Sequence, residues 1–90
     1  MLEREVRIIN PLGLHARAAA KLVRLARTFQ SRISIEHRTA NATANAKSML
    51  SILAIAAGKD SILVIVTDGP DEDAAMVAVG DLVGSGFGEI

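Results

Sequence analysis

The fold is decided by one stretch of sequence, Ser61-Ile62-Leu63-Val64-Ile65-Val66-Thr67. This run is continuously apolar and rich in β-branched residues, which is typical of a well-buried strand at the centre of a sheet. The turn sequence Asp68-Gly69-Pro70 follows it and predicts a final helix, with Pro70 near the first helical position. The acidic residues 71–73 then lie on the favourable side of the helix dipole. We expect this helix to run to about Val83 and to be ended by Gly84.

The rest of the chain predicts a sheet covered by helices. Alternation of charged and apolar residues predicts strands over 3–9 and 31–38, with a hairpin turn and a short strand over 39–46. Helical periodicity predicts a helix over 16–29, and the apolar stretch 47–57 predicts a short one ended by Gly58. The order strand, helix, strand, strand, helix, strand, helix predicts an α+β two-layer sandwich with helices on one face of the sheet.

Length and composition predict a single domain over residues 1–90, since half of the residues are apolar and the charges balance. The absence of cysteine excludes disulfides and cysteine-based zinc sites from this chain. The charged start, residues 1–5, is unlike a signal peptide, and no apolar run approaches the ~20 residues of a membrane span. We expect a cytoplasmic protein without membrane insertion and, because no dimer seam is evident, a monomer.

The charges are segregated along the chain. Residues 6–35 contain no acid, whereas every charged residue after Lys59 is acidic. The predicted helix over 16–29 carries the basic charge on one face, through Arg17, Lys21, Arg24 and Arg27, opposite an apolar face made by Ala18, Leu22, Leu25, Ala26 and Phe29. With only two aromatic residues for base stacking, nucleic acid is a poor partner for this face. An acidic protein is the better one.

His15 is the candidate reactive residue. It stands at the start of the first predicted helix, where unpaired backbone N–H groups and the helix dipole favour an anion. Arg17 adds a cation able to hold phosphate oxygens. A metal site is not predicted, because His37 is the only other histidine and lies in a different element. A serine–histidine hydrolytic pair stays open, although the chain lacks a Gly-x-Ser-x-Gly elbow. Phosphoryl acceptance by the neutral imidazole is the most economical role.

Ser48 stands at the predicted start of the second helix. A helix N-cap hydroxyl alone would explain a serine there. A helix N-terminus also stabilises an added phosphate, so a regulatory phosphorylation site is the alternative.

Two segments resemble motifs of the HPr family, the histidine-containing phosphocarriers of the phosphoenolpyruvate:sugar phosphotransferase system. The family's active-site motif is matched by Gly13-Leu14-His15-Ala16-Arg17, and its regulatory-serine segment by Ala46-Lys47-Ser48-Met49-Leu50-Ser51-Ile52-Leu53. Segments 57–60, 68–74 and 86–89 also resemble the family, so that the resemblance covers essentially the whole chain in order. Two departures are Ala18, where the family usually has proline, and about two extra residues in the 38–46 hairpin.

The resemblance implies a four-stranded antiparallel sheet covered on one face by three helices, in the order βαββαβα. It implies a phosphoryl carrier rather than an independent enzyme, with no cofactor. Enzyme I would phosphorylate Nδ1 of His15, Arg17 would steady the phosphoryl group, and IIA components of sugar permeases would receive it. HPr kinase/phosphorylase would phosphorylate Ser48. Both transfer partners would dock on a surface made by Leu14, Met49, Leu50 and Leu53 with Lys21, Arg24, Arg27 and Lys47.

Two other functions stay open. A regulatory paralogue of the same family would act in a nitrogen-type phosphorelay, or as a serine-phosphorylated co-regulator, without a direct role in transport. A ferredoxin-like small-molecule or RNA-binding domain would share the order of elements, but the shortage of aromatic residues counts against RNA.

Overall fold

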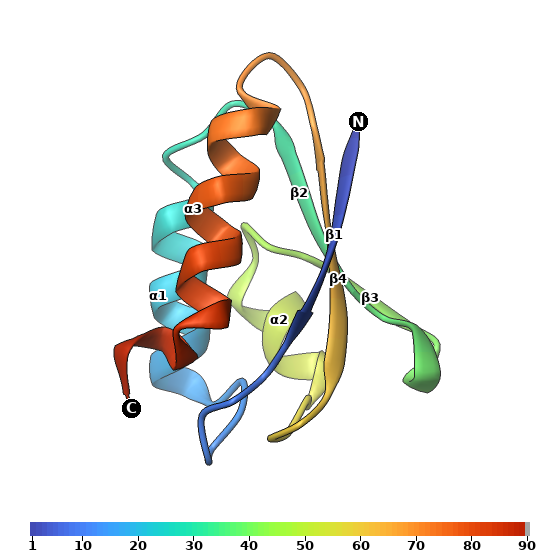
Figure 1. The fold of residues 1–90 in the computed structure, drawn as a ribbon, viewed down its shortest axis with the longest axis vertical. Helices are drawn as coiled ribbons and strands as arrows, with labels where there is room; N and C mark the ends of the chain where they lie inside the picture. The colour runs from blue at the N-terminus through green and yellow to red at the C-terminus, as the bar shows by residue number, and fades with distance from the viewer. Residues whose placement is uncertain (90) are drawn as a thin grey trace.

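The computed structural model describes residues 1–89 and has the expected two-layer architecture (Figure 1). Within these residues one antiparallel sheet has the strand order β1-β4-β2-β3, formed by β1 (Leu2–Arg7), β2 (Arg32–His37), β3 (Ala42–Asn45) and β4 (Ile62–Asp68). One face is covered by α1 (Ala16–Ala26), α2 (Met49–Ile55) and α3 (Glu72–Gly84), and short 3₁₀ turns lie at η1 (Arg38–Ala40) and η2 (Gly86–Gly88). The βαββαβα order is confirmed. No helix among these described residues is long and apolar enough to cross a membrane.

The strand β4 lies inside the sheet, between β1 and β2, as its apolar sequence predicts. Leu63 and Ile65 face the helices and are at most 1% exposed. Thr67 is also fully buried on this strand, and its hydroxyl donates to the carbonyl of Glu72 at 3.0 Å. The largest buried side chains of the core come from α1, β2, α2, β4 and α3, from the residue that follows β1 and from η2, and they include Ile8, Leu22, Ile33, Ile35, Ile52, Leu63, Ile65, Val79, Val83 and Phe87.

On the face of the sheet without helices, Arg38 forms two ion pairs that cross β4. Its guanidinium donates to Glu36 at 2.8 Å and to Glu3 at 2.6 Å, and these two carboxylates belong to the strands on either side of β4. Val64 pairs with Glu36 in the β2–β4 register and is only 6% exposed. The bridge across β4 therefore explains how a valine on the open face is buried.

The first helix ends earlier than its periodicity predicts. α1 ends at Ala26 rather than near Phe29, because the Thr28 N–H and hydroxyl both donate to the carbonyl of Leu25, at 3.0 and 2.7 Å. The buried face of α1 differs correspondingly from the predicted one. It includes Ala19 and Val23, whereas Leu25 and Phe29 are only partly buried.

The second helix also ends early, and Gly58 does not end it. α2 ends at Ile55, and Ala56 adopts the left-handed conformation (φ 52°, ψ 37°) that is expected of a glycine. The cause lies in the loop before α1, where the Leu14 N–H donates to the carbonyl of Ala57 at 2.9 Å. Gly13 has φ +62°, and a Cβ atom there would lie 2.3 Å from the same oxygen. The left-handed turn at Ala56 ends α2 and lets the carbonyl of Ala57 accept the hydrogen bond from the Leu14 N–H.

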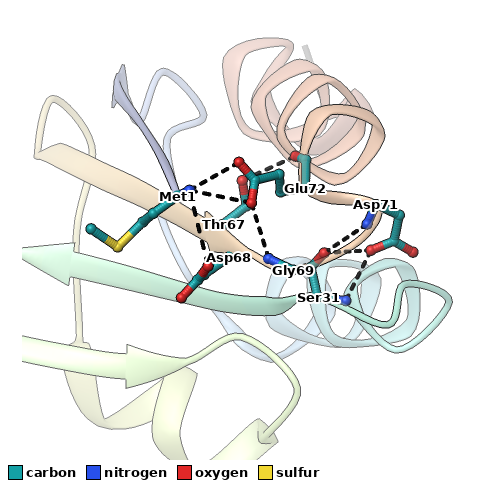
Figure 2. A network of polar contacts seen from close by, with 7 residues as sticks. All are labelled: Met1, Ser31, Thr67, Asp68, Gly69, Asp71 and Glu72. Atoms are coloured by element: carbon teal, nitrogen blue, oxygen red, sulfur yellow. Dashed lines mark hydrogen bonds and ion pairs between the residues drawn. The ribbon is translucent and has the colours of Figure 1, made fainter.

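The third helix begins at Glu72, two residues after Pro70, so the prediction that Pro70 lies near the first helical position is wrong. Asp71 precedes the helix and makes no capping bond to it. Its carboxylate instead accepts the hydroxyl of Ser31 at 2.5 Å and the N–H of Ser31 at 2.9 Å (Figure 2). It also accepts the N–H of Gln30 at 2.9 Å. These contacts join the β4–α3 turn to the α1–β2 turn. The hydrogen bond from the Ser31 hydroxyl, with the backbone donors, lowers the pKa of the Asp71 carboxyl to about 2.

We expect Asp71→Asn to remove part of the acid sensitivity of the fold. The folded-state pKa of about 2 lies below the ordinary value of 3.8, so the ionised Asp71 stabilises the fold fully above that value and progressively less as the pH falls toward 2. The difference in urea midpoint between wild type and Asp71→Asn is therefore expected to be constant between about pH 5 and 7 and to shrink below about pH 4. Circular dichroism during urea unfolding measures it.

Asp73→Asn is the matched control, because Asp73 lies exposed in the same turn of α3 and no hydrogen bond to its side chain occurs within residues 1–89. A wild-type advantage over Asp71→Asn that stayed constant down to pH 2 would contradict this account of Asp71.

Candidate functional site

The loop that leads to His15 is held by its own hydrogen bonds. The side-chain amide of Asn10, which is fully buried, donates to the carbonyl of Gly13 at 2.8 Å, and the Gly13 N–H donates back to the carbonyl of Asn10 at 3.1 Å. The bond from Leu14 to Ala57 fixes the far side of the loop. These bonds therefore fix the backbone that precedes α1, and with it the position of His15.

His15 occupies the N-cap position of α1, with extended backbone angles (φ −73°, ψ 174°), and its side chain makes no capping bond. Its carbonyl accepts the first helical bond, from the Ala19 N–H at 2.8 Å. The N–H groups of residues 16–18 consequently stand at the open end of the helix, and the first turn holds no acid. This is an electropositive setting for an anion attached to the imidazole.

One ring nitrogen of His15 has a carboxylate partner. Nε2 lies 2.5 Å from Oε2 of Glu89, and Oε1 of Glu89 accepts the side-chain amide of Asn10 at 2.9 Å. The side chains of His15 and Glu89 are 24% and 15% exposed. Burial raises the pKa of the Glu89 carboxyl, but the hydrogen bonds from Asn10 and His15 outweigh it, and the net pKa lies below the usual range. Glu89 is thus held as a carboxylate.

An open cavity of about 440 Å³ adjoins this pair and is lined by Pro11, Leu12, Arg17, Lys21, Gly88 and Glu89. Arg17 is exposed at its edge, one helical turn or less from His15. The ammonium of Lys21 donates to the carbonyl of Phe87 at 2.7 Å and so fastens the C-terminal segment to α1. The structure places His15 and Arg17 at the same end of α1.

The other predicted site residues lie on α1 and α2 in different settings. Arg24, Arg27 and Leu53 are exposed, Leu50 is 84% exposed, and Met49 is half-buried. Arg27 Nε donates to the carbonyl of Lys47 at 3.0 Å and joins the two helices. Ser48 is the N-cap of α2, where its hydroxyl accepts the Ser51 N–H at 3.3 Å. The capping role considered for Ser48 is therefore present.

Three predicted docking residues are less available than expected. Leu14 is only 5% exposed and belongs to the core, because the bond from its N–H to Ala57 holds this segment of the loop against the end of α2. The ammonium groups of Lys21 and Lys47 each bind a backbone carbonyl at 2.7 Å, those of Phe87 and Phe29. The prediction of Leu14 as a surface residue is wrong.

Sequence reasoning missed Asn10, Leu12 and Glu89. Leu12 is 72% exposed at the cavity next to Arg17. Glu89 is 74 residues from His15 in sequence, so no local spacing could connect them. The sequence signal that could have indicated the role of this segment is Phe87, one of only two aromatic residues. Its place between two glycines is typical of a turn whose aromatic side chain is anchored in the core.

Comparisons with known proteins show the family to which the chain belongs. The family described as PTS HPr component phosphorylation site matches residues 2–85. A phosphocarrier protein HPr of Cupriavidus necator is 45% identical over 89 residues, covering 99% of this chain and 98% of the relative. A phosphocarrier protein NPr of Shewanella violacea is 42% identical over 88 residues, covering 98% and 94%. The crystal structure of HPr-C-His from Thermoanaerobacter tengcongensis has a TM-score of 0.93 at 38% identity, covering 100% of this chain and 99% of that one. This chain belongs to the HPr family, the phosphocarriers of the phosphotransferase system.

Proposed function

We propose that this HPr phosphocarrier accepts its phosphoryl group on Nδ1 of His15 from phospho-enzyme I and passes it to IIA components of sugar permeases. One observation supports this most strongly. His15 stands at the N-cap of an acid-free helix end with its ring unused for capping. A phosphoryl group there meets the free N–H groups of residues 16–18 and the dipole of α1.

In this transfer the Nδ1 lone pair attacks the phosphorus, and an N–P bond forms as the donor's N–P bond breaks. The reverse exchange, with a IIA protein as acceptor, releases the group again. Arg17, exposed beside the helix end, would hold the phosphoryl oxygens. The chain is a carrier in a relay, which matches its family.

We place the docking surface for enzyme I and IIA proteins on α1 and α2, at Arg24, Arg27, Met49, Leu50 and Leu53. Leu50 is 84% exposed, which is unusual for a large apolar side chain unless it serves a contact. The nearby arginines lack carboxylate partners within ion-pair distance among residues 1–89. An apolar centre with a basic rim suits a partner surface that is apolar and acidic.

Ser48 is proposed as the regulatory phosphorylation site, acted on by HPr kinase/phosphorylase. Its hydroxyl begins α2, directly before Met49 and Leu50 of the docking surface. A dianion at this position would be compatible with the helix end. It would also place negative charge beside apolar residues that must be desolvated on docking, and transfer through His15 would slow.

A second candidate is a nitrogen-type phosphorelay, favoured by the similarity to the Shewanella violacea phosphocarrier protein NPr. The same His15 chemistry would then serve a regulatory acceptor. Transfer from the phosphorylated protein to purified sugar-type and nitrogen-type IIA proteins, compared by rate, discriminates between these two functions.

We expect His15→Ala to abolish phosphoryl acceptance from phosphoenolpyruvate and enzyme I, with the fold retained because the ring is not a cap. Phosphorus NMR detects the acid-labile phosphohistidine in the wild type. His37→Ala is the matched control, as it removes the only other histidine. A phosphohistidine signal that survived in His15→Ala and vanished in His37→Ala would overturn the assignment.

Reversing one exposed charge tests the docking surface. Arg24→Glu is expected to weaken binding to enzyme I about fivefold at physiological salt, and more at low salt, because charge at an interface rim mainly steers association. Arg24 is chosen over Arg27, whose side chain joins α1 to α2. Titration calorimetry at two salt concentrations measures the effect. Arg32→Glu, an exposed charge on β2, is the control, and an equal loss in both variants would argue against a docking surface on α1.

Ser48 can be tested for charge and capping separately. Ser48→Asp is expected to slow phosphorylation of His15 by enzyme I at least severalfold, because it mimics some of the regulatory charge. Ser48→Ala removes the bond to the Ser51 N–H and is expected to cost about 1 kcal/mol of unfolding free energy with transfer unchanged. Stopped-flow or quench kinetics compares the variants. Equal transfer rates in wild type and Ser48→Asp would leave Ser48 as a cap only.

A further inference from the structure

We propose that Glu89 is a positioning residue for phosphoryl transfer: its carboxylate holds the Nε2–H of His15, which leaves Nδ1 as the nucleophilic nitrogen and stabilises the ring once it is phosphorylated. This inference rests on the proposed role of His15. It assigns a function to a residue at the other end of the chain, beyond the helix end and Arg17.

The Glu89 carboxylate is held by hydrogen bonds through both of its oxygens. Oε2 lies 2.5 Å from His15 Nε2, while Oε1 accepts the Asn10 amide at 2.9 Å, so both carboxylate oxygens are used. Asn10 is fully buried, and its amide also donates to Gly13 in the loop before His15. The carboxylate therefore joins the histidine to the loop that positions it. No hydrogen bond within residues 1–89 involves Nδ1 of His15.

The segment that carries Glu89 is anchored rather than loose. Phe87 is 1% exposed in the core and adopts φ 57°, with glycines of positive φ on both sides. Lys21 on α1 donates to its carbonyl at 2.7 Å, and the Glu89 N–H donates to the carbonyl of Gly86 at 3.0 Å. These contacts place the end of the chain beside the start of α1 (Figure 1). The position of the carboxylate thus follows from buried packing.

The contact between Glu89 and Nε2 determines which nitrogen of the neutral His15 ring carries the proton. One ring nitrogen carries the proton and the other the lone pair, and an ionised carboxylate only accepts hydrogen bonds. With Glu89 at Nε2, the proton is on Nε2 and the lone pair on Nδ1. When Nδ1 forms the N–P bond, the ring keeps the Nε2 proton and becomes cationic. The Glu89 carboxylate then faces a positive ring, which favours the phosphorylated form.

Two variants separate the hydrogen bond from the charge. Glu89→Ala removes both, whereas Glu89→Gln keeps the shape and one acceptor oxygen but loses the charge. Glu5→Gln is the matched control, since Glu5 is an exposed acid on β1 and no hydrogen bond to its side chain occurs in the described residues. Equal amide spectra and thermal unfolding midpoints in all four proteins establish that the fold is kept.

The first measurement is nitrogen NMR of the histidine rings in the protein alone. The wild type and Glu5→Gln are expected to show His15 as the Nε2–H tautomer, with that proton protected from exchange. In Glu89→Ala we expect the protected proton to disappear and the Nδ1–H tautomer to become detectable. In Glu89→Gln the single amide oxygen can accept from only one of the two donors, the His15 ring or the Asn10 amide, so we expect the preference for the Nε2–H tautomer to be weaker than in the wild type.

The second measurement is the equilibrium of phosphoryl exchange with enzyme I. The equilibrium constant for phosphorylation is expected to fall on the order of tenfold in Glu89→Gln and at least as much in Glu89→Ala, as for the loss of one charge-assisted hydrogen bond. Glu5→Gln is expected to match the wild type.

The outcomes are distinguishable. A Glu89→Ala protein with the wild-type tautomer and the wild-type equilibrium would overturn the role of Glu89, as would a changed tautomer with unchanged transfer. Normal phosphoryl acceptance by His15→Ala would instead overturn the proposed function itself, and this role of Glu89 with it.

Discussion

The close approach of Gly13 to the carbonyl of Ala57 is the constraint on which the site depends. A Cβ atom at residue 13 would lie 2.3 Å from this oxygen, and the neighbouring Leu14 N–H bonds to it at 2.9 Å. The contact ties the loop before α1 to the end of α2, so that Leu14 is buried and His15 begins the helix. It also obliges α2 to end early, with Ala56 in a left-handed conformation that costs a non-glycine residue about 1 kcal/mol.

The segregation of charge along the sequence takes a specific form in the folded chain. Acidic side chains from the second half of the chain contact residues of the first half. Glu89 contacts His15, and Asp71 accepts a hydrogen bond from Ser31. Asp60 forms an ion pair with Arg7 at 3.1 Å. These acidic side chains thus stabilise the fold through contacts within the molecule. The exposed arginines of α1 keep no carboxylate neighbour within ion-pair distance in residues 1–89, and their positive field is left for other molecules.

The sequence predicts the features of the structure that depend on local pattern. The apolar run of β4, the amphipathic α1 and the order of elements follow from periodicity, and His15 with Arg17 follows from adjacency in one motif. Element ends are less predictable: Thr28 ends α1 through a bond to Leu25 that competes with helical periodicity, and the end of α2 coincides with a contact between Ala57 and the distant Leu14. For the same reason the burial of Leu14 is not predictable from its motif, and the roles of Asn10 and Glu89 emerge only in the folded chain.

The Arg38 bridge over β4 bears on how molecules of this protein meet one another. An uncovered strip of Val64 and Val66 would invite face-to-face association through the sheet. The guanidinium and the carboxylates of Glu3 and Glu36 place three charged groups across that strip, so a second molecule would have to break both ion pairs before it reached the valines. The ion pairs therefore disfavour sheet-to-sheet association on the helix-free side and leave the helical layer, which carries His15, without a comparable barrier.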